Sequence, residues 1–325
     1  MANLTPSGSN TVTKANAQGA NDVGFIPELW SDEIVASYQK NLVLANLVNK
    51  MSMTGKKGDT LHIPKPERGS ANAKTAADTV TIQQNTNTEV TLTIDKHYEY
   101  SRLIEDIVEV QALDSLRRFY TEDAGYALAT QIDTDLFALG KYLGDDNGSG
   151  SDWVHSNSFF MDASTNLTAY AADTVVPADL FTDVGFREAV KELDDNDVPM
   201  DQRFLVIPPS VVQTVRGIDR YNSSEFVSGQ PVVNGQIGSL YGIDIYVSTN
   251  CPVVETAAEN GATNGGELKA GLLGHRDAMV FAEQMGVRSQ TQYKQEFLAN
   301  LYTADTLYGV KVLRPESALT LIFNS

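Results

Sequence analysis

A short acidic segment packs four carboxylates together, and these side chains could do chemistry. Paired carboxylates can hydrolyse glycosidic bonds, one as the acid and the other as base or nucleophile, and clustered carboxylates can hold calcium. The EF-hand spacing is absent, and no base, nucleophile or oxyanion device accompanies the segment. We therefore favour a solvated, charged helix end that leads into a turn at Pro199. The four residues of the segment ELDDNDVP are Glu192, Asp194, Asp195 and Asp197.

The histidines form no metal-binding motif. They are scattered along the chain, and neither HExxH nor another paired ligand spacing joins them. Two of them fall on strands expected to pair and could meet there, but a zinc site usually needs three protein ligands or more. We therefore expect no metal site. The four histidines are His62, His97, His155 and His275.

Two further sequence features also do not indicate a catalytic site. The letters His275-Arg276-Asp277 occur in the catalytic loop of protein kinases, but Ala282 stands where that loop has asparagine, and no Asp-Phe-Gly follows. We expect a turn between strands at Arg276 and Asp277. The single cysteine, Cys251, excludes an intrachain disulfide, and its type is more often a small buried residue than a nucleophile. The sequence thus indicates no enzyme, and we assign no catalytic, cofactor-binding or metal-ligating residue.

The composition predicts an acidic, folded chain. Its 325 residues are 42% hydrophobic and 20% charged, enough for a sizeable core in two domains or one elaborate one. The net charge is −18, and most of it comes from residues 111–201, which hold 18 acidic and 5 basic side chains. Such a field repels nucleic acid and disfavours a sequence-reading DNA-binding protein. We find neither an apolar run of membrane-spanning length nor an apolar signal core.

The first quarter of the chain predicts an arm, a helix and a projecting flap. Residues 1–24 are polar with almost no apolar anchor, which is typical of an arm that orders against another molecule. Near-helical spacing of apolar residues predicts a helix over Glu28–Asn49. Two strand-like runs, Thr60–Ile63 and Val90–Tyr100, then flank about 25 polar residues. That segment is too long for an ordinary hairpin loop, so we expect a two-stranded flap that rests on another molecule.

A very long helix and a compact module follow the flap. Apolar residues at helical spacing predict one helix from Asp114 or Ser115 to Leu143, long enough to be the backbone of an extended subunit. Alternating helix and strand signals then predict an α/β module over about residues 177–284, inserted into the first domain. For the end of the chain we expect a small helical turn at Ala304–Thr306, then strands over Tyr308–Leu313 and Ala318–Phe323 that rejoin the first half.

This order of elements, with the stretches SLYGIDIYVS, GLLGHRDAMVFAEQ and YGVKVLRPES, resembles the major capsid proteins of tailed bacteriophages. Within these it is most similar to the coat proteins of short-tailed phages (podoviruses). The resemblance covers residues 25–325 and implies the α+β, Hong Kong 97-type (HK97-like) capsid fold. The implied function is a structural protein that assembles as hexamers and pentamers into an icosahedral shell around double-stranded DNA.

The resemblance also assigns parts to the chain. It implies a flexible N-terminal arm, an N-terminal helix, an extended loop that laps over a neighbouring subunit, and a peripheral domain with a spine helix at 114–143. It further implies an axial domain at the capsomer centres and terminal strands that return to the peripheral domain. In the same order, the ranges are 1–26, 27–55, 56–90, 91–176, 177–284 and 285–325.

For contacts between subunits we consider opposite charges on the flap and on the long helix. Basic residues outnumber acidic ones at the base of the flap, and the helix region is acidic. We therefore expect the flap of one subunit to meet the spine helix of the next, with charge reversal at Lys65 and Arg68 impairing assembly. The basic candidates are Lys56, Lys57, Lys65, Arg68 and Lys74, and the acidic ones are Asp114, Glu122, Asp123, Asp133 and Asp135.

The implied partners are further copies of the chain, a scaffolding protein, a portal protein and a decoration protein. DNA would be enclosed without sequence-specific binding, and no membrane or cofactor is involved. The implied location is the virion, assembled in the cytoplasm of a bacterial host. Three alternatives stay open: a shell protein of a cellular nanocompartment (encapsulin) with the same fold, an acidic-cluster hydrolase, and a filamentous or adhesive surface protein.

Overall fold

The computed structural model describes a large part of the chain. All described residues belong to one compact unit, Tyr38–Ser325, of the two into which the chain divides. The expected arm at 1–26 lies outside them. The described ranges are 43–55, 58–66, 69–77, 79–80, 82, 87–105, 115–144, 153–161, 167–170, 181–218, 238–255 and 267–324.

A four-stranded sheet is built on two very long strands. Strands β12 and β13 are antiparallel, β4 pairs antiparallel with the other edge of β13, and the short β1 pairs parallel with β12, giving the order β1-β12-β13-β4. Successive side chains of a strand point to opposite faces of the sheet, and in β4 half-buried and exposed residues alternate from Lys96 to Ser101. Their bounds are Asn49–Ser52 (β1), Lys96–Glu105 (β4), Met279–Lys294 (β12) and Ala299–Val312 (β13).

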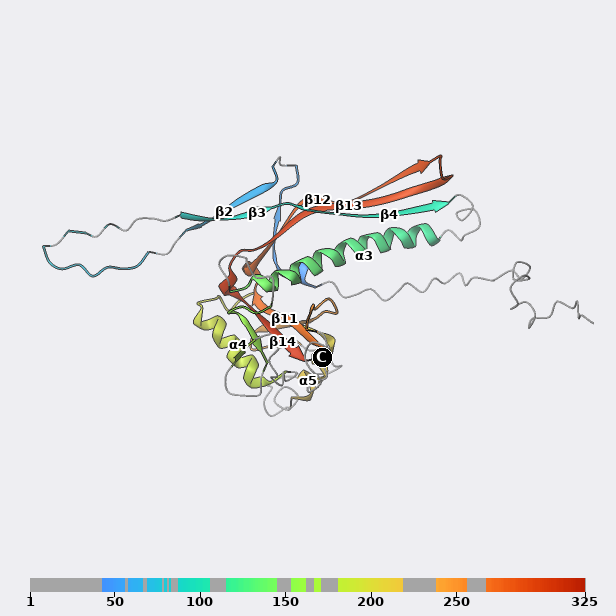
Figure 1. The fold of residues 1–325 in the computed structure, drawn as a ribbon. Coiled ribbons are helices and arrows are strands. Elements are labelled where there is room, and N and C mark those ends of the chain that lie inside the picture. Colours follow the sequence, from blue (N-terminus) through green and yellow to red (C-terminus); the bar gives the residue numbers. More distant parts are fainter. Residues whose placement is uncertain are drawn as a thin grey trace, which may run out of the picture. The chain divides into compact units, whose positions relative to one another are not determined.

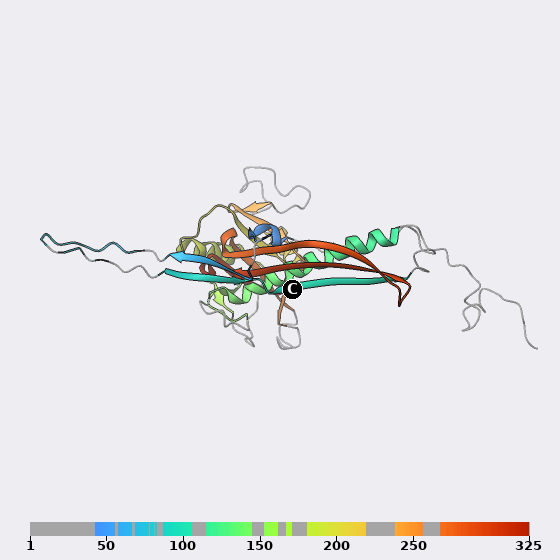
Figure 2. The same cartoon turned by 90° about the horizontal axis from the view of Figure 1, so that it is seen from above.

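One long helix runs along this sheet, as Figures 1 and 2 show. Helix α3 spans Ser115–Ala138 and continues into the 3-10 turn η2, Leu139–Tyr142. Its 24 residues correspond to a length of roughly 36 Å. Ala124 and Leu128 of the helix pack against Tyr302 and Ala304 of β13. The helix expected over 114–143 is confirmed in the described part of this range. Among the described helices, none is both long and apolar enough to cross a membrane.

The second sheet has eight strands and carries two helices on one face (Figure 1). Its order is β6-β5-β14-β11-β7-β9-β8, with β10 paired to β11. Helices α4 (Asp183–Asp195) and α5 (Pro209–Gly217) are amphipathic, and their apolar sides pack on the sheet. The strand bounds are Ser158–Phe160 (β5), Thr168–Ala169 (β6), Arg203–Ile207 (β7), Ser239–Leu240 (β8), Ile243–Val247 (β9), Val253–Glu255 (β10), Leu268–His275 (β11) and Ala318–Asn324 (β14).

The central strand β7 joins two hydrophobic cores. Leu205 and Ile207 belong to the core beneath α4 and α5. Phe204 and Val206 point to the other face and belong to a core that also contains the end of α3 and residues of β12 and β13. Because the side chains of a strand alternate, one fully buried strand serves both cores. The two sheets are thereby packed into a single unit.

The predicted flap is present as a separate two-stranded sheet. Strand β2 (Thr60–Pro66) pairs antiparallel with β3 (Asn87–Thr93), in register from Thr60 opposite Thr93 to Pro66 opposite Asn87. Leu61, Ile63 and Leu92 at its base pack against β12. The described residues between the strands are all exposed. The alternation that predicted Val90–Tyr100 as one strand in fact covers two, because Ile94 and Asp95 separate β3 from β4.

Two local predictions are wrong in the described part of the chain. The helix expected to reach Asn49 is there only a single turn, α1 (Leu44–Leu47), because Val48 is extended and residues 49–52 pair with β12. Residues 28–42 lie outside the described ranges. The helical turn expected at Ala304–Thr306 is instead part of β13, where the backbone pairs on both sides, with β12 and with β4.

Two strands near the end of the chain belong to other sheets than the sequence predicted. Strand β13 joins the sheet that contains β4, as expected of a returning strand, but β14 pairs with β11 in the eight-stranded sheet. Strand β12, expected to begin inside the module, belongs to the four-stranded sheet. The 3-10 turns η4 (Arg276–Ala278) and η5 (Pro315–Ser317) mark the two crossings. The turn expected at Arg276 and Asp277 is thus confirmed.

Candidate functional site

The acidic segment forms a structural helix end. Asp194 Oδ1 lies 2.7 Å from a guanidinium nitrogen of Arg203, whose side chain is only 3% exposed. The same guanidinium donates hydrogen bonds to the carbonyl oxygens of Val198 (2.5 Å) and Pro199 (2.8 Å). It thereby ties the turn after α4 to β7. Glu192 is half-buried, and Asp195 and Asp197 are exposed.

Replacing Arg203 with leucine should lower the free energy of unfolding by roughly 3 kcal/mol, because two carbonyl groups and one carboxylate lose a buried charged donor. Chemical denaturation monitored by circular dichroism would measure the loss. The matched control is Arg187→Leu on the surface of α4, where an ion pair with Asp183 at 3.1 Å is half-exposed and a change of about 0.5 kcal/mol is expected. Equal effects of the two substitutions would refute the structural role of Arg203.

Two of the histidines, His62 and His97, and the cysteine have local contacts or burial that explain them. His62 lies 3.1 Å from Glu89 within the flap, whereas His97 lies 3.1 Å from Asp305 in the four-stranded sheet, so the two imidazoles do not share a site. Burial, and then the charge of Asp133, raise the pKa of Cys251 to about 12, which keeps the thiol protonated. Within the described ranges no group of three possible metal ligands occurs.

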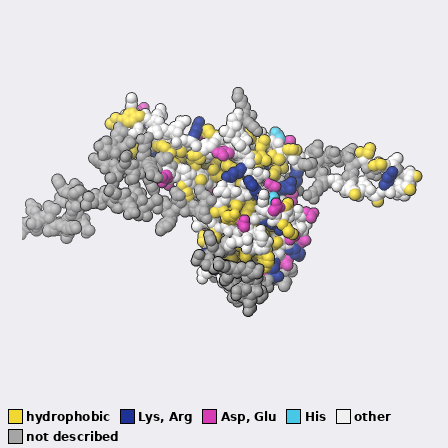
Figure 3. All heavy atoms as spheres, turned by 180° about the vertical axis from the view of Figure 1, so that it is seen from behind, with side chains coloured by type: hydrophobic (Ala, Val, Ile, Leu, Met, Phe, Trp, Pro, Cys, Tyr) yellow, Lys and Arg dark blue, Asp and Glu magenta, His cyan; other side chains and the backbone are white. Residues whose placement is uncertain are grey.

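The basic residues expected on the flap are only partly described. Lys65 lies on β2 and Lys74 on the segment beyond it, and both are exposed. Lys56, Lys57 and Arg68 lie outside the described residues, as does Asp114. What the structure adds to this surface is apolar: Val80 is 71% exposed and Ile82 is 88% exposed. Figure 3, in which the flap extends to the right, shows hydrophobic and basic side chains near its end.

Asp133 was expected at a contact between subunits, and the structure corrects this expectation. Its side chain is fully buried inside its own chain. Its carboxylate accepts hydrogen bonds from the backbone N–H groups of Val43 (3.4 Å) and Ala45 (3.1 Å) and from Nδ2 of Asn250 (3.3 Å). Burial raises the pKa of Asp133 despite these donors. A carboxylate enclosed in this way is not accessible to a neighbouring subunit.

Two further acids of the long helix are engaged within the chain. Asp135 accepts a hydrogen bond from the hydroxyl of Tyr308 (2.7 Å) and lies 3.3 Å from Nζ of Lys96. Asp123 accepts one from the hydroxyl of Tyr100 (2.9 Å). Of the acidic candidates, only Glu122 is both described and exposed. The expected acidic stripe on the helix is therefore largely a set of internal contacts between α3 and the strands.

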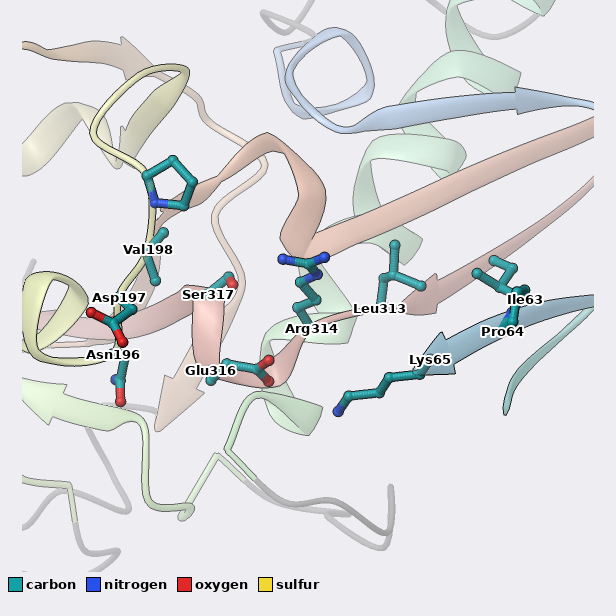
Figure 4. A pocket seen from close by; sticks show the side chains of 11 residues that line it. Ile63, Pro64, Lys65, Asn196, Asp197, Val198, Leu313, Arg314, Glu316 and Ser317 are labelled. Carbon is teal, nitrogen blue, oxygen red and sulfur yellow. The ribbon is translucent and has the colours of Figure 1, made fainter. Parts of the chain in front are cut away.

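A groove of about 630 Å³ lies beside the base of the flap. Figure 4 shows its lining side chains, which come from β2, the turn after α4 and the turn η5. Lys65 and Arg314 contribute positive charge, and Asp197 and Glu316 contribute negative charge. The groove thus brings one predicted flap residue near the end of the acidic segment. Its lining mixes apolar side chains with charges of both signs, and it is a recess between these three elements.

Sequence reasoning missed several residues that define these surfaces. Arg203, which holds the turn after α4, has no distinguishing pattern in the sequence. Arg288 donates two hydrogen bonds to Asp305, at 2.7 and 2.9 Å, across the β12–β13 pair. Leu103 lies on β4 and is 44% exposed. The alternation KHYEYSRLIE was a signal that could have placed Leu103 on an uncovered strand face.

Comparisons with known proteins agree with this architecture. A family model described as phage capsid protein matches residues 26–319. A chain from Mycobacterium phage Che8 is 25% identical, with 91% of this chain and 97% of that chain covered and a TM-score of 0.69. The capsid structure of the cyanophage P-SCSP1u is 17% identical, with 96% and 98% covered and a TM-score of 0.69.

The mature capsid of bacteriophage PhiM1 is 13% identical to this chain, with 98% of each chain covered and a TM-score of 0.64. No curated protein sequence matches. The predicted Hong Kong 97-type fold is confirmed by these similarities. Because the family model spans most of the residues, the chain belongs to the phage capsid protein family.

Proposed function

We propose that this protein is the repeating unit of an icosahedral shell that encloses double-stranded DNA, assembled as hexamers and pentamers. The observation that carries the proposal is the flap, a two-stranded projection. Its large apolar side chains Val80 and Ile82 are mostly exposed to solvent in the single chain. An isolated two-stranded ribbon is marginally stable in water. It becomes ordered when a neighbouring subunit covers it, and closure multiplies many such weak contacts.

Membership of the phage capsid protein family supports a structural role and gives no support to the nanocompartment or hydrolase alternatives. We propose further that the protein has no catalytic activity. Two observations within the described residues favour this: Asp194 is paired with Arg203, and the thiol of Cys251 is held protonated. Turnover of a glycoside that is lost on replacing Asp195 or Asp197 would contradict this part of the proposal.

We propose the following roles for the parts of the subunit. Residues 1–26 act as an arm, residues 56–90 as the loop that laps over a neighbour, and α3 with the four-stranded sheet as the peripheral domain. The eight-stranded sheet with α4 and α5 acts as the axial domain at capsomer centres. With the strand pairing taken into account, this domain includes β14 and excludes β12.

The proposed partners are other copies of the chain, a scaffolding protein, a portal protein and a decoration protein. The virion of a short-tailed phage is the proposed location, after assembly in the host cytoplasm. The net charge of −18 supports a container wall to which DNA adheres weakly. The flap residues Lys65 and Lys74 are the proposed basic contacts with a neighbouring subunit.

The test is to express the chain alone and with a candidate scaffolding protein, followed by size-exclusion chromatography and negative-stain electron microscopy. Closed shells or capsomer-sized rings are expected in at least one condition. A monodisperse monomer in both conditions, with circular dichroism showing a folded chain, would overturn the proposal.

A further inference from the structure

A small polar pocket lies between helix α1, the turn η4 and two strands of the eight-stranded sheet. Its volume is about 260 Å³, and none of its lining residues lines the groove beside the flap. Two of the lining residues, Leu47 and Phe204, are apolar. The others are polar or charged: Asn46, Gln202, Arg203, Asp244, Tyr246 and Arg276. The pocket is therefore suited to a small polar ligand.

Arg276 brings an unpaired positive charge to this pocket. Its side chain is exposed, and its guanidinium has no ion-pair or hydrogen-bond partner in the part of the chain that the structure describes. The adjacent acid is already engaged, because Asp277 accepts a hydrogen bond from Nδ2 of Asn49 (3.2 Å), and its backbone N–H donates to Nδ1 of His275 (3.1 Å). The N–H donors of the Arg276 side chain are therefore available to a ligand.

Asp244 brings the opposite charge to the same pocket. It lies on β9 between the buried residues Ile243 and Ile245, and it is itself exposed. Within the described ranges its carboxylate, too, lacks an ion-pair or hydrogen-bond partner. Arg276 and Asp244 thus line one pocket without pairing with each other. A ligand that carries both charges would pair with both of them.

Arg203 adds hydrogen-bond donors but little net charge. Its side chain is buried, and Asp194 lies 2.7 Å from one terminal nitrogen. That nitrogen and Nε also donate to the carbonyl oxygens of Val198 and Pro199. The second terminal nitrogen makes no further contact with the described residues. It can therefore donate to a ligand in the pocket that Arg203 lines.

Gln202 and Asn46 complete the polar lining. Gln202 has a left-handed backbone (φ 56°), which is uncommon for a residue other than glycine and is typical of residues at binding sites. Its carbonyl oxygen accepts a hydrogen bond from the backbone N–H of Arg276 (3.3 Å), which fixes the two residues to each other. Oδ1 of Asn46 accepts a hydrogen bond from Nζ of Lys50 (3.1 Å), so the amide nitrogen remains a donor.

From this arrangement we infer that the pocket binds a small zwitterion of the amino acid class, with its carboxylate on Arg276 and its ammonium group on Asp244. A guanidinium pairs with a carboxylate through two parallel hydrogen bonds, and Arg203 and Asn46 supply further donors. A phosphate dianion fits less well, because Asp244 repels it. The same two charges can come from a free amino acid or from neighbouring acidic and basic side chains of a second copy. The inference goes beyond the proposed shell function and does not depend on it.

The test uses the unassembled full chain and probes that differ in charge and spacing. Glycine, β-alanine and 4-aminobutyrate carry both charges at increasing separation, whereas propionate and propylamine carry one charge each. Each probe is titrated while the N–H signals of the arginine side chains are followed by nuclear magnetic resonance. At least one zwitterion should bind saturably, with a dissociation constant on the order of 1 mM, which is attainable for so few atoms. Propionate and propylamine should bind roughly tenfold more weakly.

Two substitutions separate the two charges. Arg276→Gln should weaken binding of the best zwitterion roughly tenfold and leave propylamine unchanged, while Asp244→Asn should remove the advantage of that zwitterion over propionate. Both side chains are exposed, so circular dichroism should show folded variants. The matched control is Arg314→Gln, which removes another exposed arginine that has no partner among the described residues and should leave binding unchanged.

Each outcome has a defined meaning. Equal binding by the wild type and Arg276→Gln, or no saturation by any of the three zwitterions, would overturn the inference. Binding that persists in assembled shells identifies a free amino acid as the source of the ligand. Binding lost on assembly, with shells of Arg276→Gln dissociating at a lower guanidinium concentration, identifies side chains of a neighbouring copy. A chain that forms no shells refutes the proposed function, while the titration of the unassembled chain still decides the inference.

Discussion

Replacing Asp133 with alanine is expected to lower the free energy of unfolding by roughly 3 kcal/mol or more, because several buried donors then lose one acceptor. The carboxylate accepts hydrogen bonds from the backbone of Val43 and Ala45 and from the side chain of Asn250. It thereby fixes helix α1, at the start of the described chain, to α3. Denaturant unfolding of the unassembled chain measures the stability, and negative-stain microscopy measures the yield of shells.

Two variants separate the buried carboxylate from a general effect of helix charge. Asp123→Ala removes an acid of the same helix whose carboxylate accepts a hydrogen bond from the hydroxyl of Tyr100, and it should cost about 1 kcal/mol. Asp133→Asn keeps one acceptor oxygen and the side-chain volume, so its cost should fall between those of the two alanine variants. A loss at Asp133→Ala no larger than that at Asp123→Ala would show that the buried hydrogen bonds contribute little.

The pKa of Asp133 also gives a sign for the pH dependence. Burial raises this pKa in the folded protein above its ordinary value of 3.8. The protonated form is therefore favoured in the folded state, and this contribution to stability is complete below about pH 4 and lost as the pH rises through the folded pKa. The stability of the wild type relative to Asp133→Asn should therefore be highest below about pH 4 and should decrease as the pH rises through the folded pKa. Denaturation of both proteins at several pH values would show this.

The elements with strong local patterns could be predicted from the sequence. Helix α3 has apolar residues at helical spacing over its whole length, and that spacing matches the face that packs on β13. The flap was indicated by alternation on both sides of a long polar segment. The acidic segment was correctly predicted to be a helix end, since Glu192, Asp194 and Asp195 lie in the last turn of α4. These features depend on residues close together in the chain.

The elements that depend on distant partners could not be predicted in the same way. Asp133 is one acid among several on a helix, and its three partners lie 88, 90 and 117 residues away. Strand β14 was assigned to the wrong sheet because its partner, β11, is selected by packing beneath α4 and α5. The residues Ala304–Thr306 were predicted to form a turn from their own types, but Arg288 and His97 pair with Asp305 from the neighbouring strands.

Gly309 provides the second large expected effect, because it lies where the flap joins the four-stranded sheet. A Cβ at this position would overlap the carbonyl oxygen of Thr93 and lie 3.2 Å from the Cα of Ile94. Both are backbone atoms, so no side-chain rotation relieves the contact. Gly309→Val should therefore push the β3–β4 link away from β13 and lower the free energy of unfolding by roughly 3 kcal/mol.

The consequences for assembly should exceed those for folding. The core beneath α4 and α5 contains no residue of the flap, of the β3–β4 link or of β13, so the Gly309→Val chain should keep these helices, while the base of its flap becomes sensitive to limited proteolysis. Shell yield should fall sharply, because a displaced flap no longer extends from the four-stranded sheet in the position from which it would reach a neighbouring subunit. Far-ultraviolet circular dichroism, proteolysis followed by mass spectrometry, and electron microscopy measure the three properties separately.

Gly125 is the matched control, since it lies within α3 and a Cβ there would meet nothing within 4 Å. Gly125→Ala should stabilise the chain by about 0.5 to 1 kcal/mol, because alanine is the better helix former, and shells should form as before. Gly309→Ala should already be destabilising, since its single methyl group meets the same backbone atoms. If Gly309→Ala behaves like Gly125→Ala, the close approach of the β3–β4 link to β13 does not exist as described.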